Sequence, residues 1–250
     1  MKPRTLILVI EYDGTEFAGW QAQPGKRTVQ TELERAIGKL TGKRCRVVAA
    51  GRTDTGVHAF SQVAHLKTAS DLLLHEVKGG LNSLLPRDIV VLDVREGPAG
   101  FDARRQAKGK IYRYVIINRR ERPALDRNRS WHVREPLDVE AMRRGARYLL
   151  GEHDFRSFRG QRCASENAVR VIRRVDVKVQ PPDRVIIEVE ATAFLRQMVR
   201  VIVGTLVEVG RGRWAPERVR DALWACDRRS AGPTAPPQGL YLVEIQYEEF

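Results

Sequence analysis

Residues 173–191 read RRVDVKVQPPDRVIIEVEA, and this stretch decides what kind of sheet the chain builds. Apolar and polar residues alternate on both sides of Pro181-Pro182-Asp183, which is the pattern of two strands joined by a tight turn. Strands joined in this way run antiparallel. The sequence therefore predicts a hairpin here, and a largely antiparallel sheet around it.

The elements on either side of this hairpin alternate between strands and helices. In the second half of the chain, the sequence predicts strands over residues 110–118 and 239–247. It predicts helices over residues 137–151, 193–210 and 215–226. The first half predicts the order β-α-β-β-α-β over residues 6–12, 28–42, 46–50, 62–68, 71–85 and 88–96. In the first helix, Thr28 is the expected N-cap and Gly42 the expected stop. A mixed sheet with helices on one side is the natural architecture.

The division of the chain follows from its length and from the lack of linkers. At 250 residues it accommodates one large domain or two packed halves. No linker or low-complexity segment lies between residues 100 and 110. We therefore expect an N-terminal half of residues 1–105 and a C-terminal half of residues 106–250, intimately packed and not independent. The proline-bearing stretch GPTAPPQG (232–239) is expected to be a loop.

The charge of the chain points to a polyanionic partner. The net charge is +13, and 35 of the 44 basic residues are Arg. Arginine binds phosphate bidentately and stacks on bases, which suits RNA. A genome or growth temperature that favours Arg is an alternative cause. Charge alone does not separate an RNA enzyme from a passive RNA-binding protein.

Several other classes of protein are excluded. No apolar run approaches the roughly 20 residues that span a bilayer, and the run 6–10 is too short for a signal peptide. We therefore expect a cytoplasmic protein with no membrane association. The histidines lack HxH and HExxH spacing, so no metal is expected. No disulfide is expected either, because the cysteines are widely separated: Cys45, Cys163 and Cys226.

Residues 49–60, AAGRTDTGVHAF, contain the Asp-Thr-Gly that also carries the carboxylate of aspartic proteases. A protease dyad needs a second such tripeptide or a short chain that dimerises, and the sequence offers neither. Arg52, two residues from Asp54, would also hold that carboxylate ionised and oppose a shared proton. Two interpretations remain for Asp54: a turn residue supported by Thr53 and Gly56, or a nucleophile for other chemistry.

The wider motif favours the second interpretation. GRTDTGVHA closely resembles the GRTD-x-GVH signature of the tRNA pseudouridine synthase A family, with Thr55 where many members carry Ala. Further blocks resemble the family in the correct order along the chain: EYDGTEFAGWQAQ (11–23), TVQTELERAI (28–37), NSLLPRDI (82–89), FDARRQAKGKIYRYVI (101–116), GEHDFRSFR (151–159), AFLRQMVRVIVGTLVEVG (193–210) and GLYLVE (239–244).

The resemblance implies a function, a fold and partners. It implies that uridines 38, 39 and 40 in the anticodon stem-loop of tRNA are isomerised to pseudouridine, without cofactor or metal. The implied fold is α+β, in which two ferredoxin-like halves form one mixed, largely antiparallel sheet with helices on one side. Asp54 would lie in a central cleft where the halves meet. The implied assembly is a homodimer that holds each tRNA across both subunits.

The resemblance also assigns roles to single residues. Asp54 matches the catalytic carboxylate, which attacks either the ribose or the base. Arg200 matches the arginine that pairs with it, and the apolar helix around Arg200 agrees with a buried cation that needs an anionic partner. Tyr112 matches the tyrosine that stacks on the target uracil. Leu240 matches the apolar residue that closes the pocket, and Arg52 helps to extrude the nucleotide or holds its phosphate.

Simpler interpretations stay open for these residues. Alternation places Tyr112 and Tyr114 on the same strand face, so periodicity does not distinguish a pocket from a core, and Leu240 fits an ordinary core strand equally well. The candidates for phosphate contacts lie in Arg-rich loops: Arg104, Arg105, Arg119, Arg120, Arg156 and Arg159. The rival function is a catalytically silent RNA-binding or remodelling protein on the same fold.

Overall fold

The computed structural model describes residues 3–160 and 167–248. The chain forms two compact units. Unit 1 comprises the chain up to Lys108 together with the chain from Leu242 onward, and unit 2 comprises Gly109–Tyr241. The change of unit at Lys108 is close to the predicted boundary at residue 105. The grouping of the last strand with unit 1 differs from the predicted division at one point, since that strand was expected in the C-terminal half.

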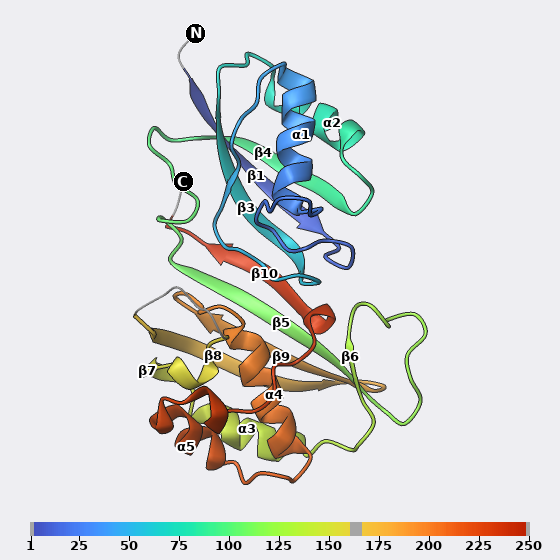
Figure 1. The fold of residues 1–250 in the computed structure, drawn as a ribbon, viewed down its shortest axis with the longest axis vertical. Coiled ribbons are helices and arrows are strands. Elements are labelled where there is room, and N and C mark those ends of the chain that lie inside the picture. The colour runs from blue at the N-terminus through green and yellow to red at the C-terminus, as the bar shows by residue number, and fades with distance from the viewer. Residues whose placement is uncertain (1–2, 161–166, 249–250) are drawn as a thin grey trace. The chain divides into compact units, whose positions relative to one another are not determined.

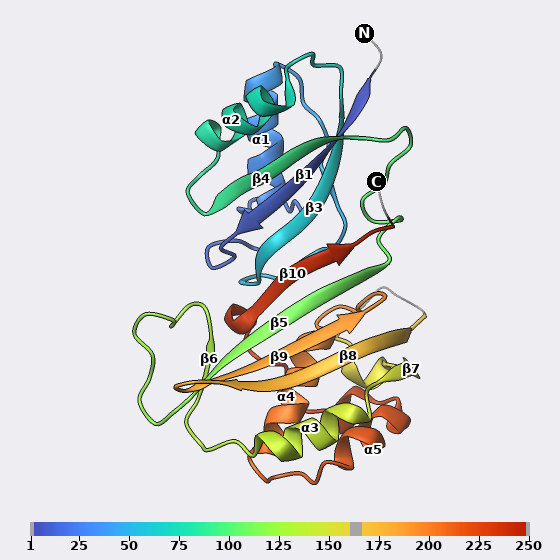
Figure 2. The ribbon, with the colours of Figure 1, turned by 180° about the vertical axis from the view of Figure 1, so that it is seen from behind.

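Unit 1 has a mainly antiparallel sheet. Its elements are β1 (Arg4–Tyr12), α1 (Val29–Thr41), β2 (Val48–Ala49), β3 (His58–Thr68), α2 (Leu74–Leu84), β4 (Ile89–Gly97) and the greater part of β10 (Leu240–Gln246). Strand β1 pairs antiparallel with both β3 and β4, and β2 pairs antiparallel with β3. Helices α1 and α2 lie on one face of this sheet (Figure 1, and from behind in Figure 2). The predicted order β-α-β-β-α-β is confirmed.

Helix α1 begins and ends at the residues that the sequence predicted. The side chain of Thr28 accepts a hydrogen bond from the backbone N–H of Thr31, which satisfies a free donor of the first turn. Gly42 ends the helix in the left-handed conformation at φ 70°. The apolar face of α1, with Leu33 and Ile37 among its members, is almost completely buried and contributes to the core of unit 1.

Unit 2 contains the hairpin and three helices. Its elements are β5 (Gly109–Asn118), β6 (Trp131–Val133), α3 (Val139–Arg147), β7 (Gly151–Asp154), the 3-10 turn η1 (Arg156–Phe158), β8 (Val169–Gln180), β9 (Arg184–Ala191), α4 (Met198–Gly210), α5 (Arg218–Ala225), and the 3-10 turns η2 (Arg228–Ser230) and η3 (Pro237–Gly239). The strand order is β5-β9-β8-β7. The three helices lie on one face of this sheet in both views (Figure 1, Figure 2).

The pairing of the strands in unit 2 confirms the predicted hairpin. Strands β8 and β9 are antiparallel, and Gln180 faces Arg184 across the turn at residues 181–183. Strand β6 pairs parallel with β5, so the sheet is mixed. The α+β class with a largely antiparallel sheet is therefore confirmed. The central cleft between the halves stays a prediction.

Two predicted helix boundaries are wrong, and two short strands were not predicted. Helix α4 begins at Met198 rather than at residue 193, because Gln197 adopts a left-handed φ of 60° that a helix does not continue through. Helix α3 ends at Arg147, before Gly151, which instead opens β7. The short strands β6 and β7 were not predicted, since three or four residues carry too little periodicity to recognise.

Candidate active site

Asp54 lies in unit 1 on the loop of residues 51–57, which joins β2 to β3 and is called the Asp54 loop below. Its side chain is half-buried. The Val57 N–H donates to the Asp54 carbonyl oxygen at 3.2 Å, and Gly56 follows with φ 77°. Asp54 therefore opens a turn, as the simpler interpretation of the tripeptide held, and in that turn its carboxylate retains some exposure.

The N-terminal segment 13–20 packs along the Asp54 loop and is bonded to it through the backbone. The Trp20 N–H donates to the Thr53 carbonyl at 3.1 Å, and the Gly56 N–H donates to the Phe17 carbonyl at 3.3 Å. Two stretches that carried the resemblance separately, EYDGTEFAGW and GRTDTGVH, thus lie side by side. Backbone bonds on both sides of Asp54 fix the position of its Cα.

Two glycines allow this close approach. A Cβ on Gly14 would lie 2.0 Å from the Val57 carbonyl oxygen, and one on Gly19 would lie 2.6 Å from the Thr53 carbonyl oxygen. Gly19 also has φ 87°, which favours glycine. Since the obstructing atoms are backbone, a side chain at either position would displace the Asp54 loop. Sequence reasoning missed both residues, although Asp13-Gly14 is a dipeptide typical of turns.

A buried hydroxyl pair supports the same loop from within the unit. The Tyr12 hydroxyl is 2.7 Å from the Thr53 hydroxyl, and Gln62 Nε2 donates to the Gly51 carbonyl at 2.8 Å. Burial raises the pKa of Tyr12 to about 12, against the hydrogen bonds from Thr53 and Gln62, which lower it. Tyr12 is therefore neutral throughout the physiological range.

Arg52 lies on the same loop as Asp54. Its side chain is exposed, and it makes no ion pair with an acidic side chain in residues 3–160 and 167–248. The expected effect of Arg52 on the ionisation of Asp54 stays a prediction. The guanidinium remains available to a partner molecule.

Arg200 lies in unit 2, in the first turn of α4, and is half-buried. Its Nε donates to the Ala235 carbonyl at 2.7 Å, and the Ala235 N–H donates to the Arg200 carbonyl at 3.0 Å. The loop that follows Gly232 is held against the helix, since a Cβ on Gly204 would lie 1.8 Å from the Pro233 carbonyl oxygen. The stretch GPTAPPQG, predicted only as a loop, thus fixes the arginine.

Tyr112 and Leu240 are both buried in unit 2. Tyr112 is 7% exposed, pairs with Val189 on β9, and packs edge-to-face on Phe194 with ring centroids 5.0 Å apart. Tyr114, two residues on, donates its hydroxyl to the Pro236 carbonyl at 2.7 Å. Leu240 is 5% exposed at the start of β10. Both tyrosines are buried, and the roles of Tyr112 and Leu240 stay predictions.

The five predicted residues thus fall into two groups. Asp54 and Arg52 share one loop of unit 1, whereas Tyr112, Arg200 and Leu240 belong to unit 2. Each group has its own supporting contacts, and the residues missed by sequence reasoning are those that provide this support.

The Arg-rich loops differ in how many of their charges are already paired. Arg119 is paired with Asp183 at 2.6 Å and Arg156 with Asp154 at 2.5 Å. Arg120 has no acidic partner in the described chain. It lines a shallow hollow of about 490 Å³ together with Asn118, Arg119, Arg134, Glu135 and Pro136.

Metal ligands and cysteines give no further candidate site. No group of three or more His, Cys, Asp or Glu residues suited to a metal ion occurs in the described part of the chain. Cys45 and Cys226 are free thiols, and Cys163 lies outside the described residues. Among the described helices, none is long and apolar enough to cross a membrane.

The comparison with known proteins agrees with this arrangement of motifs. A family model described as tRNA pseudouridine synthase matches residues 8–104 and 146–248, which include the Asp54 loop and Arg200. The chain belongs to the tRNA pseudouridine synthase family. It is thus an enzyme of the pseudouridine synthase type, an isomerase of RNA modification, and the family resemblance is confirmed. Tyr112 lies between the two matched regions of this pseudouridine synthase.

Relatives of this pseudouridine synthase match it over nearly their full length. The tRNA pseudouridine synthase A of Myxococcus xanthus is 48% identical over 244 residues, 98% of this chain and 92% of that protein. The one of Geotalea uraniireducens is 46% identical over 244 residues, 98% of this chain and 100% of that protein. Among solved structures, a chain of a Cbf5-Nop10-Gar1 complex matches at a TM-score of 0.36 and 12% identity, covering 98% of this chain and 58% of that one. So loose a match has no bearing on function.

Proposed function

We propose that this enzyme converts uridines 38, 39 and 40 of the tRNA anticodon stem-loop to pseudouridine, with Asp54 as the nucleophile. The observation that carries the proposal is the Asp54 loop itself. It presents a half-buried carboxylate within the family motif, and backbone bonds to segment 13–20 fix its position. A catalytic group has to be held in this way to meet its substrate in a productive geometry.

The reaction needs a carboxylate and no redox partner. The bond between ribose C1′ and uracil N1 breaks, the uracil turns, and a new bond forms between C1′ and C5. The C5 proton is lost and N1 gains one, so substrate and product are isomers. A carboxylate supports this by attacking the ribose, as in retaining glycosidases, or by attacking the base.

Residues of both halves contribute to the proposed site. The target nucleotide has to leave the base stack to be reached. Tyr112 stacks on the uracil, Leu240 closes the pocket, and Arg200 pairs with Asp54 to hold it ionised. Arg52, exposed and without an ionic partner in the described chain, helps to extrude the nucleotide or binds its phosphate. The C-terminal half thereby completes a cleft in which Asp54 lies, and the two halves pack as one body.

The proposal also covers the cellular location and the assembly of the enzyme. We expect a cytoplasmic homodimer that holds each tRNA across both subunits. Neither a cofactor nor a metal is required by the isomerisation, because every bond change is accounted for by the carboxylate and by proton transfer. The excess of 35 Arg over 9 Lys supports a partner that is rich in phosphate.

The decisive test is the release of tritium from tRNA that carries 5-³H-uridine. Wild-type enzyme should release tritium, and Asp54→Asn should release none while still binding tRNA. Thr55→Ala is the matched control, because it changes the exposed neighbour in the same turn, and should retain full activity. If the wild type binds tRNA and releases no tritium, the chain is a silent RNA-binding protein. If Asp54→Asn keeps full turnover, the assignment of the nucleophile fails.

A further inference from the structure

Stacked aromatic rings and guanidinium groups lie where α5 packs against α3 in unit 2. The Arg220 guanidinium carbon is 4.9 Å from the ring centroid of Trp224 and 5.7 Å from that of Tyr148. A second stack places Arg218 over Trp214 at 5.5 Å. Each stack orients a cation over a ring. Arg220 is also paired with Asp221 at 3.1 Å, whereas Arg218 has no acidic partner in the described chain.

Trp224 is more exposed than the other three tryptophans of the chain. It is 69% exposed, whereas Trp20 is 1% exposed and Trp131 and Trp214 are half-buried. Packing α5 onto α3 accounts for Tyr148 and Arg220, which lie between the helices. It does not account for an indole that contributes little to any core. Trp and Arg side chains are enriched at binding interfaces, so the exposed indole beside arginines is a candidate binding surface.

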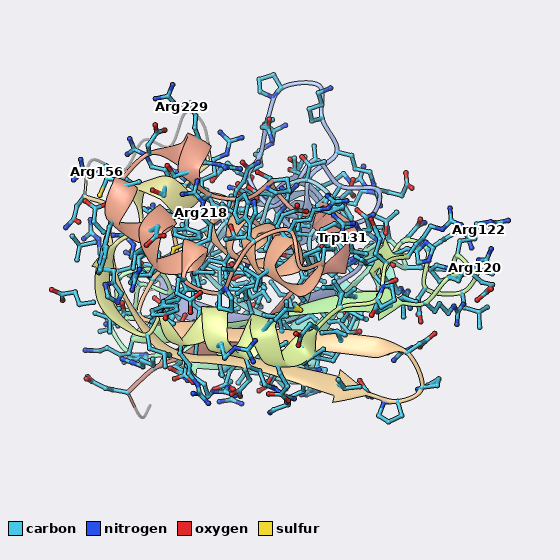
Figure 3. The ribbon with its side chains drawn as sticks, turned by 90° about the horizontal axis from the view of Figure 1, so that it is seen from below. Arg120, Arg122, Trp131, Arg156, Arg218 and Arg229 are labelled. Carbon is cyan, nitrogen blue, oxygen red and sulfur yellow. The ribbon has the colours of Figure 1, made fainter. Side chains whose placement is uncertain are left out.

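Several arginines lie on the elements that surround Trp224. Exposed arginines Arg156, Arg218 and Arg229 come from η1, α5 and η2, which pack together (Figure 3). Arg156 and Arg229 are paired with the neighbouring Asp154 and Asp227. Their charges are therefore largely balanced, and these two arginines add little to the local field.

Arg218 and two further arginines supply the excess charge. Arg218 on α5 and Arg144 and Arg147 in the last turn of α3 are exposed. None of them has an acidic partner within the described ranges. With Trp224 and Arg220 they form what is called the α5 surface below. An open ring beside several unbalanced guanidinium groups is the combination that binds unpaired nucleotides.

We infer that the α5 surface binds an unpaired stretch of the tRNA away from the target uridine. The open face of Trp224 stacks on a base, and Arg218, Arg144 and Arg147 bind neighbouring phosphates. The inference rests on the proposed function for its choice of tRNA. Helix α5 packs on α3, η1, η2 and β7, and none of these elements carries a residue proposed to face the target uridine. The surface therefore adds a second attachment point.

Charge argues against a second copy of this chain as the occupant. A two-fold contact places the same patch of each subunit against its counterpart. Here that would bring the three unbalanced arginines of one copy against those of the other. Protein interfaces, by contrast, are depleted of charge at their centre. A polyanion with exposed bases satisfies both the ring and the cations.

Tryptophan fluorescence and affinity test the inference together. Adding an unmodified tRNA transcript to the wild type should quench the emission of the exposed indole, and this part of the change should be absent in Trp224→Ala. The Kd for tRNA should rise at least about fivefold in Trp224→Ala, as expected for the loss of one base stack. Val179→Ala is the matched control. Val179 is 56% exposed on β8 of the same unit and has no arginine stack, so its Kd should match that of the wild type.

The possible outcomes separate this inference from the proposed function. Equal Kd values for Trp224→Ala and Val179→Ala, with unchanged quenching, would overturn the inference. So would a smaller sedimenting species for Trp224→Ala at unchanged Kd, because the surface would then belong to a second copy. If the wild type releases no tritium and tRNA still quenches Trp224, the surface stands and the proposed catalysis falls. Normal tritium release without quenching means that the surface alone fails.

Discussion

Asp54 and Arg200 are held in place by two different constructions. Asp54 lies on a loop, and the glycines lie on the segment that approaches it, at Gly14 and Gly19. Arg200 lies on a helix, and there the helix itself provides a glycine, Gly204, against which the loop of residues 232–236 packs. In unit 1, segment 13–20 fixes the backbone of the Asp54 loop. In unit 2, the loop of residues 232–236 fixes the side chain of Arg200.

These two constructions predict which substitutions would displace each residue. The Asp54 loop depends on backbone contacts within about 3 Å, so an added atom displaces the carboxylate itself. The Arg200 backbone belongs to a helix with its own hydrogen bonds, and the neighbouring loop determines only where the guanidinium points. We therefore expect changes of backbone space to matter most in unit 1, and changes of side chain to matter most in unit 2.

The largest effect should come from Gly14→Ala. Its new Cβ would lie 2.0 Å from the Val57 carbonyl oxygen, so the Asp54 loop has to move. We expect turnover, measured by tritium release, to fall more than about hundredfold. The free energy of unfolding, measured in urea, should fall by about 3 kcal/mol. Gly79→Ala is the control, since its Cβ meets nothing within 4 Å on helix α2, and it should not destabilise the protein. Full activity in Gly14→Ala would contradict the role assigned to segment 13–20.

The second largest effect should come from Arg200→Ala, which tests the fixed side chain in unit 2. If the guanidinium stabilises the Asp54 carboxylate, turnover should drop about hundredfold, as when one positioned charge partner is removed. Affinity for tRNA in a filter-binding assay should change much less. Arg196→Ala serves as the control, because it removes an exposed arginine just before α4. An equal loss of turnover and of binding would instead make Arg200 a phosphate contact.

The smallest effect should come from Tyr12→Phe. Loss of the hydroxyl leaves Thr53 without its 2.7 Å partner, at a cost of about 1 kcal/mol in the free energy of unfolding near neutral pH. The folded pKa of Tyr12, about 12, is above its unfolded value of 10.0. The stability that comes from a neutral Tyr12 is thus present below pH 10 and is lost as the pH rises toward 12. The difference in the free energy of unfolding between the wild type and Tyr12→Phe, measured in urea, should therefore narrow as the pH rises from 10 toward 12. A constant gap would mean that Tyr12 ionises freely in the fold.

Sequence patterns predicted the elements with strong periodicity or a clear punctuating residue. Thr28 and Gly42 bounded α1, and the Pro181-Pro182-Asp183 turn gave the hairpin of β8 and β9. Those signals are local, because an N-cap bond or a left-handed residue needs only a few neighbours. The left-handed Gln197 has no such signal, and this is why the start of α4 was placed too early.

Contacts between distant segments were beyond the reach of these patterns. The supports of Asp54 come from Tyr12, Gly14, Gly19 and Gln62, at separations of up to 42 residues in the chain. Neither spacing nor composition connects such positions. The family resemblance assigned catalytic roles to Asp54 and Arg200. The structure adds the residues that hold these two side chains in position.

The return of the chain to unit 1 has a consequence for its synthesis. Strand β10 lies next to β3, and beyond it the Tyr247 hydroxyl donates to the Ala103 carbonyl at 2.7 Å. The bond between Tyr247 and Ala103 joins residues that lie 144 positions apart in the sequence. A ribosome therefore releases all of unit 2 before the edge of β3 is covered, and until then that edge is open to pairing with another chain. Unit 1 is therefore begun before unit 2 and completed after it.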